Sequence, residues 1–211
     1  FLSLLALNRT LNTKYKTKTK TVFPYYGSGQ KLINDSNIDY AVIPSSDWIV
    51  PINYTPSKKE RIKKYDEHTN NIMAAIKIST IVKRGHYNII HSNTSYTYVG
   101  ALASRICGVP HVWHIRELLE EDQNKQIMDK SAGYGLMSKS ALVIAISKTV
   151  HDKYCRIVPA NKVKVIYNGI DKNKFYRPAK TIFSGSKPIF LFVSGSDSPL
   201  KGRKELIDAC A

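Results

Sequence analysis

The stretch IHSNTSYTYVGALASRICGVPHVWHIRE, residues 90–117, contains the pattern that decides the fold. Four apolar residues in its middle recur at the i, i+3, i+4 and i+7 spacing of one helix face: Val99, Leu102, Ala103 and Ile106. Gly108 is placed to end that helix, and Pro110 marks the change to an extended segment at 111–115. Short apolar segments thus flank one amphipathic helix. This order predicts two parallel strands joined by a helical crossover.

The same alternation of strand and helix continues on both sides of this unit. Further strands are predicted at four segments: KTVFPYYGSG (20–29), YAVIP (40–44), ALVIAIS (141–147) and KVKVIYNG (162–169). Residues 142–146 are apolar without alternation, which predicts a strand covered on both faces. The alternating lysines of 162–165 favour an edge strand instead. The predicted fold class is therefore α/β, with a parallel sheet and helices on both of its faces.

Composition and cysteine usage exclude several classes of protein. Of the 211 residues, 43% are hydrophobic and 23% are charged, which is typical of a globular chain. No apolar run approaches the roughly 20 residues that span a bilayer, and we expect FLSLLAL at 1–7 to be helical rather than a signal peptide. The three cysteines are far apart, so we expect a reducing compartment and no bound metal.

The charge of the chain is strongly basic. Lys and Arg total 32 against 16 Asp and Glu, a formal charge of +16. Such a field attracts phosphate groups on nucleic acids, anionic lipids or phosphorylated substrates. The densest basic cluster, KKERIKKY at 58–65, fits an exposed helix face better than a DNA-reading motif. A nucleic-acid-binding module is the alternative that this charge suggests.

Polar residues stand where three predicted strands end. They are His91 to Asn93 after one strand, His114 to Glu117 after the next, and Ser147 after a third. Ligands of parallel α/β sheets bind beyond the carboxyl ends of the strands, so we expect these groups to converge on one cleft. Side chains alternate along a strand, which predicts Trp113 in the core and His114 on the cleft side. His111 is predicted to be structural.

Four separated blocks resemble successive signatures of the family 4 glycosyltransferases. They are IHSNTSYTYVGALASRICGVPHVWHIRE, ALVIAIS, KVKVIYNGID and FLFVSGSDSPLKGRKELIDA. The resemblance runs from about residue 19 to the end, and it implies the GT-B fold, in which two Rossmann-like domains face each other. It implies an N-terminal acceptor-side domain at 1–171 whose first strand is missing, a linker at 172–187, and the start of a nucleotide-sugar domain at 188–211. A chain with so little of the second domain is expected to be inactive alone.

The resemblance also assigns roles to residues. It implies His114 beside the donor sugar as the catalytic histidine. It implies that the donor diphosphate is bound by Gly195, Ser196 and Lys201, with Ser196 standing where the family often has Arg. A cleft lined by further residues is implied: Asn93, Thr94, Arg116, Glu117, Ser147, Asn168 and Gly169. From the residues alone, an N-terminal helix cap explains Ser147 and a tight turn explains Asn168 and Gly169 equally well.

The implied function is transfer of a sugar from a nucleotide-sugar donor to a glycan or lipid-linked acceptor, with retention, in cell-surface polysaccharide or glycolipid synthesis. No cofactor or metal is expected, because a lysine and a helix N-terminus can neutralise the leaving diphosphate. We expect a cytoplasmic enzyme, peripheral at the inner face of an anionic membrane, and no nucleic-acid partner. A GT-B sugar-nucleotide 2-epimerase is the alternative enzyme.

Overall fold

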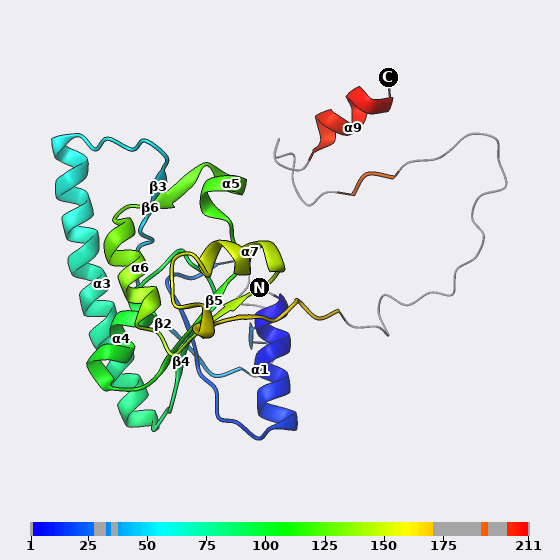
Figure 1. Cartoon of the computed structure of the whole chain (residues 1–211). Coiled ribbons are helices and arrows are strands. Elements are labelled where there is room, and N and C mark those ends of the chain that lie inside the picture. The colour runs from blue at the N-terminus through cyan, green and yellow to red at the C-terminus, as the bar shows by residue number, and fades with distance from the viewer. Residues whose placement is uncertain (1, 28–32, 35–37, 171–190, 194–201, 211) are drawn as a thin grey trace. The chain divides into compact units, whose positions relative to one another are not determined.

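The computed structural model describes residues 2–27, 33–34, 38–170, 191–193 and 202–210 (Figure 1). The chain divides into two compact units, Phe1–Asn168 and Gly169–Ala211. The predicted linker at 172–187 lies outside the described residues. The domain boundaries predicted from the sequence remain predictions.

The centre of the first unit is a four-stranded parallel sheet. Its strands are β4 (Ile90–Ser92), β5 (His111–Ile115), β7 (Leu142–Ala145) and β8 (Val163–Val165), in the order β4-β5-β7-β8. In register, His91 lies opposite Val112, and His114 lies opposite Ile144. The parallel crossover predicted from residues 90–117 is thus confirmed, and β8 is the edge strand that its alternating lysines predicted.

Two smaller sheets accompany the central one. The strands β1 (Thr21–Phe23) and β2 (Tyr40–Val42) form a parallel pair, as their apolar runs predicted. The strands β3 (Ile49–Pro51) and β6 (Lys125–Ile127) form an antiparallel pair that the sequence did not predict. Each of these last two strands has only three residues, which is too short for a reliable pattern of alternation.

The helices begin and end at recognisable capping residues. The remaining elements are α1 (Leu2–Lys14), α3 (Lys58–Gly85), α4 (Val99–Cys107), α5 (Leu119–Gln123), α6 (Lys130–Ser138), α7 (Lys148–Tyr154), η1 (Ala160–Lys162) and α9 (Arg203–Cys210). Helix α3 starts with a capping box, in which the Ser57 and Glu60 side chains each accept a hydrogen bond from the other's backbone N–H. Helix α4 ends at Gly108, whose φ of 75° is one that glycine adopts without strain. None of the helices among the described residues is both long and apolar enough to cross a membrane.

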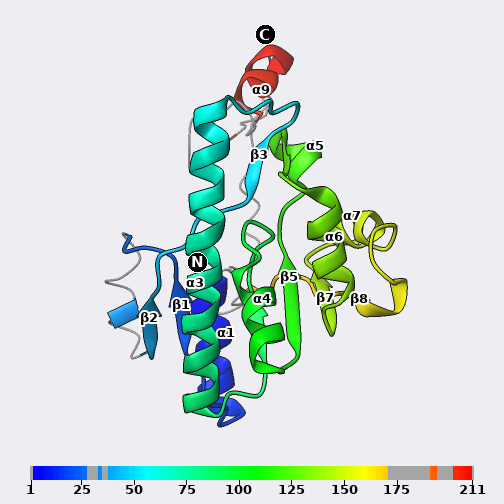
Figure 2. The same ribbon diagram turned by 90° about the vertical axis from the view of Figure 1, so that its left-hand side faces the viewer.

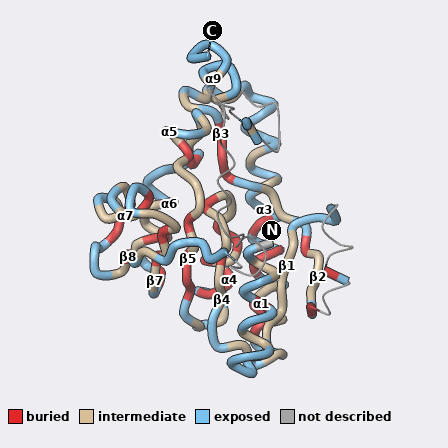
Figure 3. The backbone as a smooth tube through the Cα atoms, turned by 90° about the vertical axis from the view of Figure 1, so that its right-hand side faces the viewer, coloured by how far each residue is buried: buried red, intermediate tan, exposed pale blue. Residues whose placement is uncertain are grey.

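The core lies between the central sheet and the helices α4, α6 and α7. Trp113 is fully buried there, as its place on the strand predicted, and it stacks on Trp48 with ring centroids 6.0 Å apart. A second cluster joins α3 to α4 through Ala75 and Ala103. Figure 3 shows β5 as a mostly buried segment and α9 as a largely exposed one.

The two faces of the central sheet are unequally covered. Val143 and Ala145 are fully buried, whereas Leu142 and Ile144 on the opposite face of β7 are only half-buried. Both faces of β7 are thus at least partly covered, as predicted, but one face is covered more completely than the other. The four strands lie side by side in the same order as they occur in the chain, β4-β5-β7-β8. Right-handed crossovers between strands in this order place all of the connecting helices on the same face of the sheet. Figures 1 and 2 show α3 and α4 on one side of β4 and β5, and α1 on the other.

Candidate functional site

The carboxyl end of β5 carries an imidazole with an unpaired polar atom. His114 points to the face opposite Trp113, and it is half-buried. Its Nε2 atom is shielded from solvent and makes no hydrogen bond in the structure. Leaving a buried polar atom without a hydrogen-bond partner costs free energy, and folded proteins rarely do so. The unpaired Nε2 atom therefore indicates a place where a polar group of a ligand binds.

A second imidazole lies beside the first. His91 lies on the neighbouring strand β4 and faces the same side of the sheet, with its ring centroid 5.5 Å from that of His114. Its Nε2 atom is also buried and unpaired. The sequence placed His91 at a strand end, but it did not single it out, because only the register of β4 against β5 brings the two rings together.

Both imidazoles are held in the neutral form. Burial is the main cause that lowers the pKa of His114 from 6.5 to about 4, and the nearby His91 and Arg116 lower it further. Burial, followed by the charge of Arg116, also lowers the pKa of His91. At neutral pH each ring therefore offers one N–H donor and one lone pair, and it adds no positive charge to the cleft.

The carboxylate of Glu117 organises the loop that follows β4. Its Oε1 atom accepts a hydrogen bond from the Thr94 hydroxyl at 2.8 Å. Its Oε2 atom accepts from the Ser95 backbone at 3.1 Å, the Ser95 hydroxyl at 3.0 Å and the Arg116 backbone at 3.2 Å. The structure thus brings together Thr94 and Glu117, two of the residues predicted to line the cleft. Both oxygens of Glu117 are occupied by the protein itself, so this group positions the loop.

Arg116 joins the end of β5 to the chain after β8. Its guanidinium donates to the Asn168 side-chain oxygen at 2.8 Å, which brings together two residues predicted to line the cleft. Asn93 is half-buried directly after β4. Ser147 is the N-cap of α7, where its hydroxyl accepts from the Val150 backbone at 3.2 Å.

The remaining predicted residues are not part of this group. Gly169 is exposed and begins the second unit. Gly195, Ser196 and Lys201 lie outside the described residues. Within the described ranges, no group of three His, Cys, Asp or Glu side chains is arranged to hold a metal ion.

An ion-pair cluster that the sequence does not predict joins α5, α6 and α7. Lys153 on α7 pairs with Glu120 and, at 2.7 Å, with Glu121, and Lys130 on α6 pairs with Glu120 at 3.2 Å. The partners are 10 to 33 positions apart in the chain, so no local pattern could have identified the cluster. It holds α5 against α6 and α7.

Comparisons with known proteins agree with this architecture. The chain is 35% identical over 99 residues to the uncharacterised glycosyltransferase MJ1607 of Methanocaldococcus jannaschii, covering 42% of this chain and 25% of that protein. Its fold is similar to that of HepE from Anabaena, solved in complex with UDP-glucose, with a TM-score of 0.55 and 21% identity over 81% of this chain and 41% of that one. It is also similar to MurG of Acinetobacter baumannii, with a TM-score of 0.52 and 14% identity over 80% and 42% of the two chains.

These likenesses confirm the predicted GT-B type of fold. The chain spans about a quarter of the length of its curated relative and about two fifths of the length of these solved structures. The sequence model of Glycosyltransferase Family 4 matches residues 38–174, which include the whole of the central sheet and the group around His114. The chain therefore belongs to glycosyltransferase family 4.

Proposed function

We propose that this chain is part of an enzyme that transfers a sugar from a nucleotide-sugar donor to a glycan or lipid-linked acceptor. The observation that carries the proposal is the buried, unpaired Nε2 atom of His114 at the carboxyl end of β5. Membership of glycosyltransferase family 4 supports the reaction class, and HepE, a protein of similar fold, binds UDP-glucose.

The neutral state of His114 suits a role at the donor sugar. A neutral imidazole donates or accepts a hydrogen bond with a sugar hydroxyl. It also places no cation beside the positive charge that develops on the sugar ring as the leaving group departs. Since the oxygens of Glu117 are occupied by Thr94, Ser95 and Arg116, we propose no carboxylate nucleophile, and we infer a same-face displacement that retains configuration.

The diphosphate of the donor is assigned to the second unit. We propose that Gly195, Ser196 and Lys201 bind the donor diphosphate and that Lys201 neutralises the charge of the diphosphate as it leaves. Lys201 precedes α9, whose N-terminus favours anions. A lysine and a helix N-terminus would make a divalent metal unnecessary, so we propose a metal-independent reaction.

The experiment that tests the proposal is replacement of His114 by Ala in the full-length protein, assayed with a panel of sugar nucleotides. We expect transfer to fall about 10²- to 10³-fold, as for loss of one transition-state contact, with little change in the urea midpoint of unfolding. His114→Gln, which keeps a polar group in place, should lose less. Full activity in a folded His114→Ala variant would contradict the proposal.

The setting of the reaction is a separate proposal. Lys58, Lys59 and Arg61 lie in the first turns of α3, where Ile62 and Tyr65 are exposed by 58% and 72%. Basic and apolar side chains together favour an anionic bilayer, at about 1 kcal/mol per well-placed cation. We therefore propose a peripheral enzyme at the inner face of the membrane, active in cell-surface polysaccharide or glycolipid synthesis.

Vesicle co-sedimentation tests this setting. The protein should pellet with phosphatidylglycerol vesicles and not with phosphatidylcholine vesicles, and the difference should shrink as salt is added. Equal pelleting with both kinds of vesicle would remove the electrostatic argument.

A further inference from the structure

A pocket of about 400 Å³ lies at the edge of the central sheet opposite to His114. Its floor and walls include Val109 and Pro110 before β5, Ala141 before β7, and Lys162 before β8. All four residues precede the first residue of a strand, so the pocket lies at the amino-terminal edge of the sheet. It is therefore separate from the carboxyl edge, where the donor sugar is proposed to bind.

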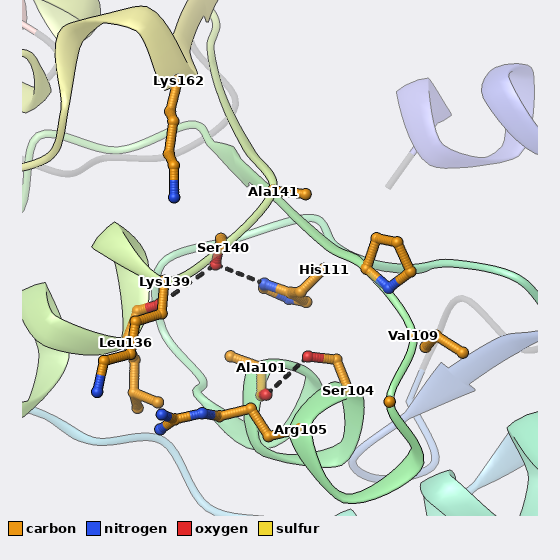
Figure 4. Close-up of a pocket in the computed structure, with 12 residues that line it drawn as sticks. Ala101, Ser104, Arg105, Val109, His111, Leu136, Lys139, Ser140, Ala141 and Lys162 are labelled. Carbon is orange, nitrogen blue, oxygen red and sulfur yellow. Dashed lines mark hydrogen bonds between the residues drawn. The ribbon is translucent and has the colours of Figure 1, made fainter.

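Three cations from different crossovers surround this pocket. Arg105 comes from α4, Lys139 follows α6, and Lys162 ends η1. Figure 4 shows the charged ends of Arg105 and Lys139 on the same side of the pocket, with Lys162 extending toward Ser140. Among the described residues Arg105, Lys139 and Lys162 form no ion pair with a carboxylate, and no Asp or Glu lines the pocket.

The uncharged polar groups of the pocket are already satisfied by the protein. His111 bonds through Nδ1 to the Ser140 hydroxyl at 3.0 Å and through Nε2 to the Ser92 hydroxyl at 2.9 Å. Ser104 donates to the Ala101 carbonyl at 2.9 Å. Burial lowers the pKa of His111 to about 4, so it is neutral at pH 7. Of the three cations, Lys162 already donates to the Ser138 carbonyl at 2.8 Å. Arg105 and Lys139 are thus the groups left to select a ligand, and they select an anion.

The size and the lining of the pocket indicate which kind of anion it can bind. A volume of about 400 Å³ lies at the lower end of the range for small-molecule sites. Arginine and lysine together favour phosphate, which accepts several charge-assisted hydrogen bonds. Val109, Pro110 and Leu136 supply apolar surface beside the cations for a short organic group. We propose that this pocket binds a phosphate monoester of glycerol-phosphate size, either free or as the headgroup of a lipid.

The pocket is tested by removing its charge in the full-length protein. The double variant Arg105→Gln/Lys139→Gln is matched by Lys83→Gln/Arg84→Gln, which removes the same charge from exposed positions at the end of α3. Calorimetric titration with sn-glycerol 3-phosphate, with glycerol as the neutral control, measures the free ligand. Co-sedimentation with vesicles of phosphatidic acid or phosphatidylcholine measures the lipid.

We expect the pocket variant to lose at least about tenfold in affinity for one of the two phosphate probes, and the matched variant to change little. Loss with glycerol phosphate identifies a soluble ligand, and loss with phosphatidic acid alone identifies a headgroup. Either result supports the pocket. Binding that is equal in both variants, or binding to neither probe by the unaltered protein, would overturn it. The urea midpoint of each variant verifies folding, and His114→Ala should leave this binding intact.

Discussion

The two ends of β5 carry histidines that differ in their hydrogen bonding. At its start, His111 is 3% exposed and has both ring nitrogens bonded, one to Ser92 and one to Ser140. At its carboxyl end, His114 is also shielded from solvent at Nε2, but that atom has no partner. The pKa of each is lowered to about 4, mainly by burial. Burial and pKa therefore do not distinguish a structural histidine from a functional one in this strand, whereas the hydrogen-bond partners do.

The largest expected difference between the two ends is in stability. His111→Ala leaves a cavity and removes the ring to which the buried hydroxyls of Ser92 and Ser140 bond, so the free energy of unfolding should fall by about 2–4 kcal/mol. His114→Ala should cost much less, because no hydrogen bond to Nε2 is lost. Urea titration of both variants makes the comparison. Equal losses would show that the two histidines are equally structural.

Acid should destabilise the protein because it protonates the histidines at both ends of β5 more readily in the unfolded chain. The folded chain keeps His111 and His114 neutral down to about pH 4, whereas the unfolded chain protonates them near pH 6.5. Between these values the unfolded state binds more protons at these two histidines, so the free energy of unfolding should fall as pH falls from about 6.5 to 4. Above that window the contribution of the two histidines is constant. Urea midpoints measured across the window test this.

The His114→Gln variant separates the two contributions to that slope. It removes one titrating imidazole, so its stability should fall less steeply with acid than that of the unaltered protein. An unchanged slope would assign the whole effect to other groups, His111 and His91 first among them.

The smallest expected effect concerns the loop beside His114. Glu117→Gln keeps the size of the side chain and one of its acceptor oxygens, and its amide can turn an N–H toward the Thr94 hydroxyl. We expect a loss of about 1 kcal/mol in the free energy of unfolding. The reason is that the hydrogen bonds now accepted by a charged carboxylate would be accepted by a neutral amide oxygen, which is a weaker acceptor. Asp122→Asn, at an exposed position on α5, is the matched control. If Glu117→Gln were no more costly than its control, Glu117 would not be what holds the loop.

Local patterns in the sequence were enough to determine the elements of the central sheet. The spacing of Val99, Leu102, Ala103 and Ile106 identified α4, Gly108 marked its end, and the alternation along 111–115 put Trp113 in the core. These features depend on residues within a few positions of one another, which is why periodicity and capping rules detect them. The resemblance of four separated blocks to one family was also available from the sequence, and the family match at 38–174 confirms it.

Only the tertiary structure decided which polar groups are occupied. The bonds of His111 to Ser92 and of Arg116 to Asn168 join residues 19 and 52 positions apart, and Glu117 is bound by residues 22 and 23 positions earlier. The register of β4 against β5 placed His91 beside His114, and three crossovers brought Arg105, Lys139 and Lys162 around one pocket. No sequence period records such distances, because they are set by how strands pair and how helices pack. The sequence by itself therefore placed residues at the ends of strands, and tertiary packing determined which of them were left without a partner.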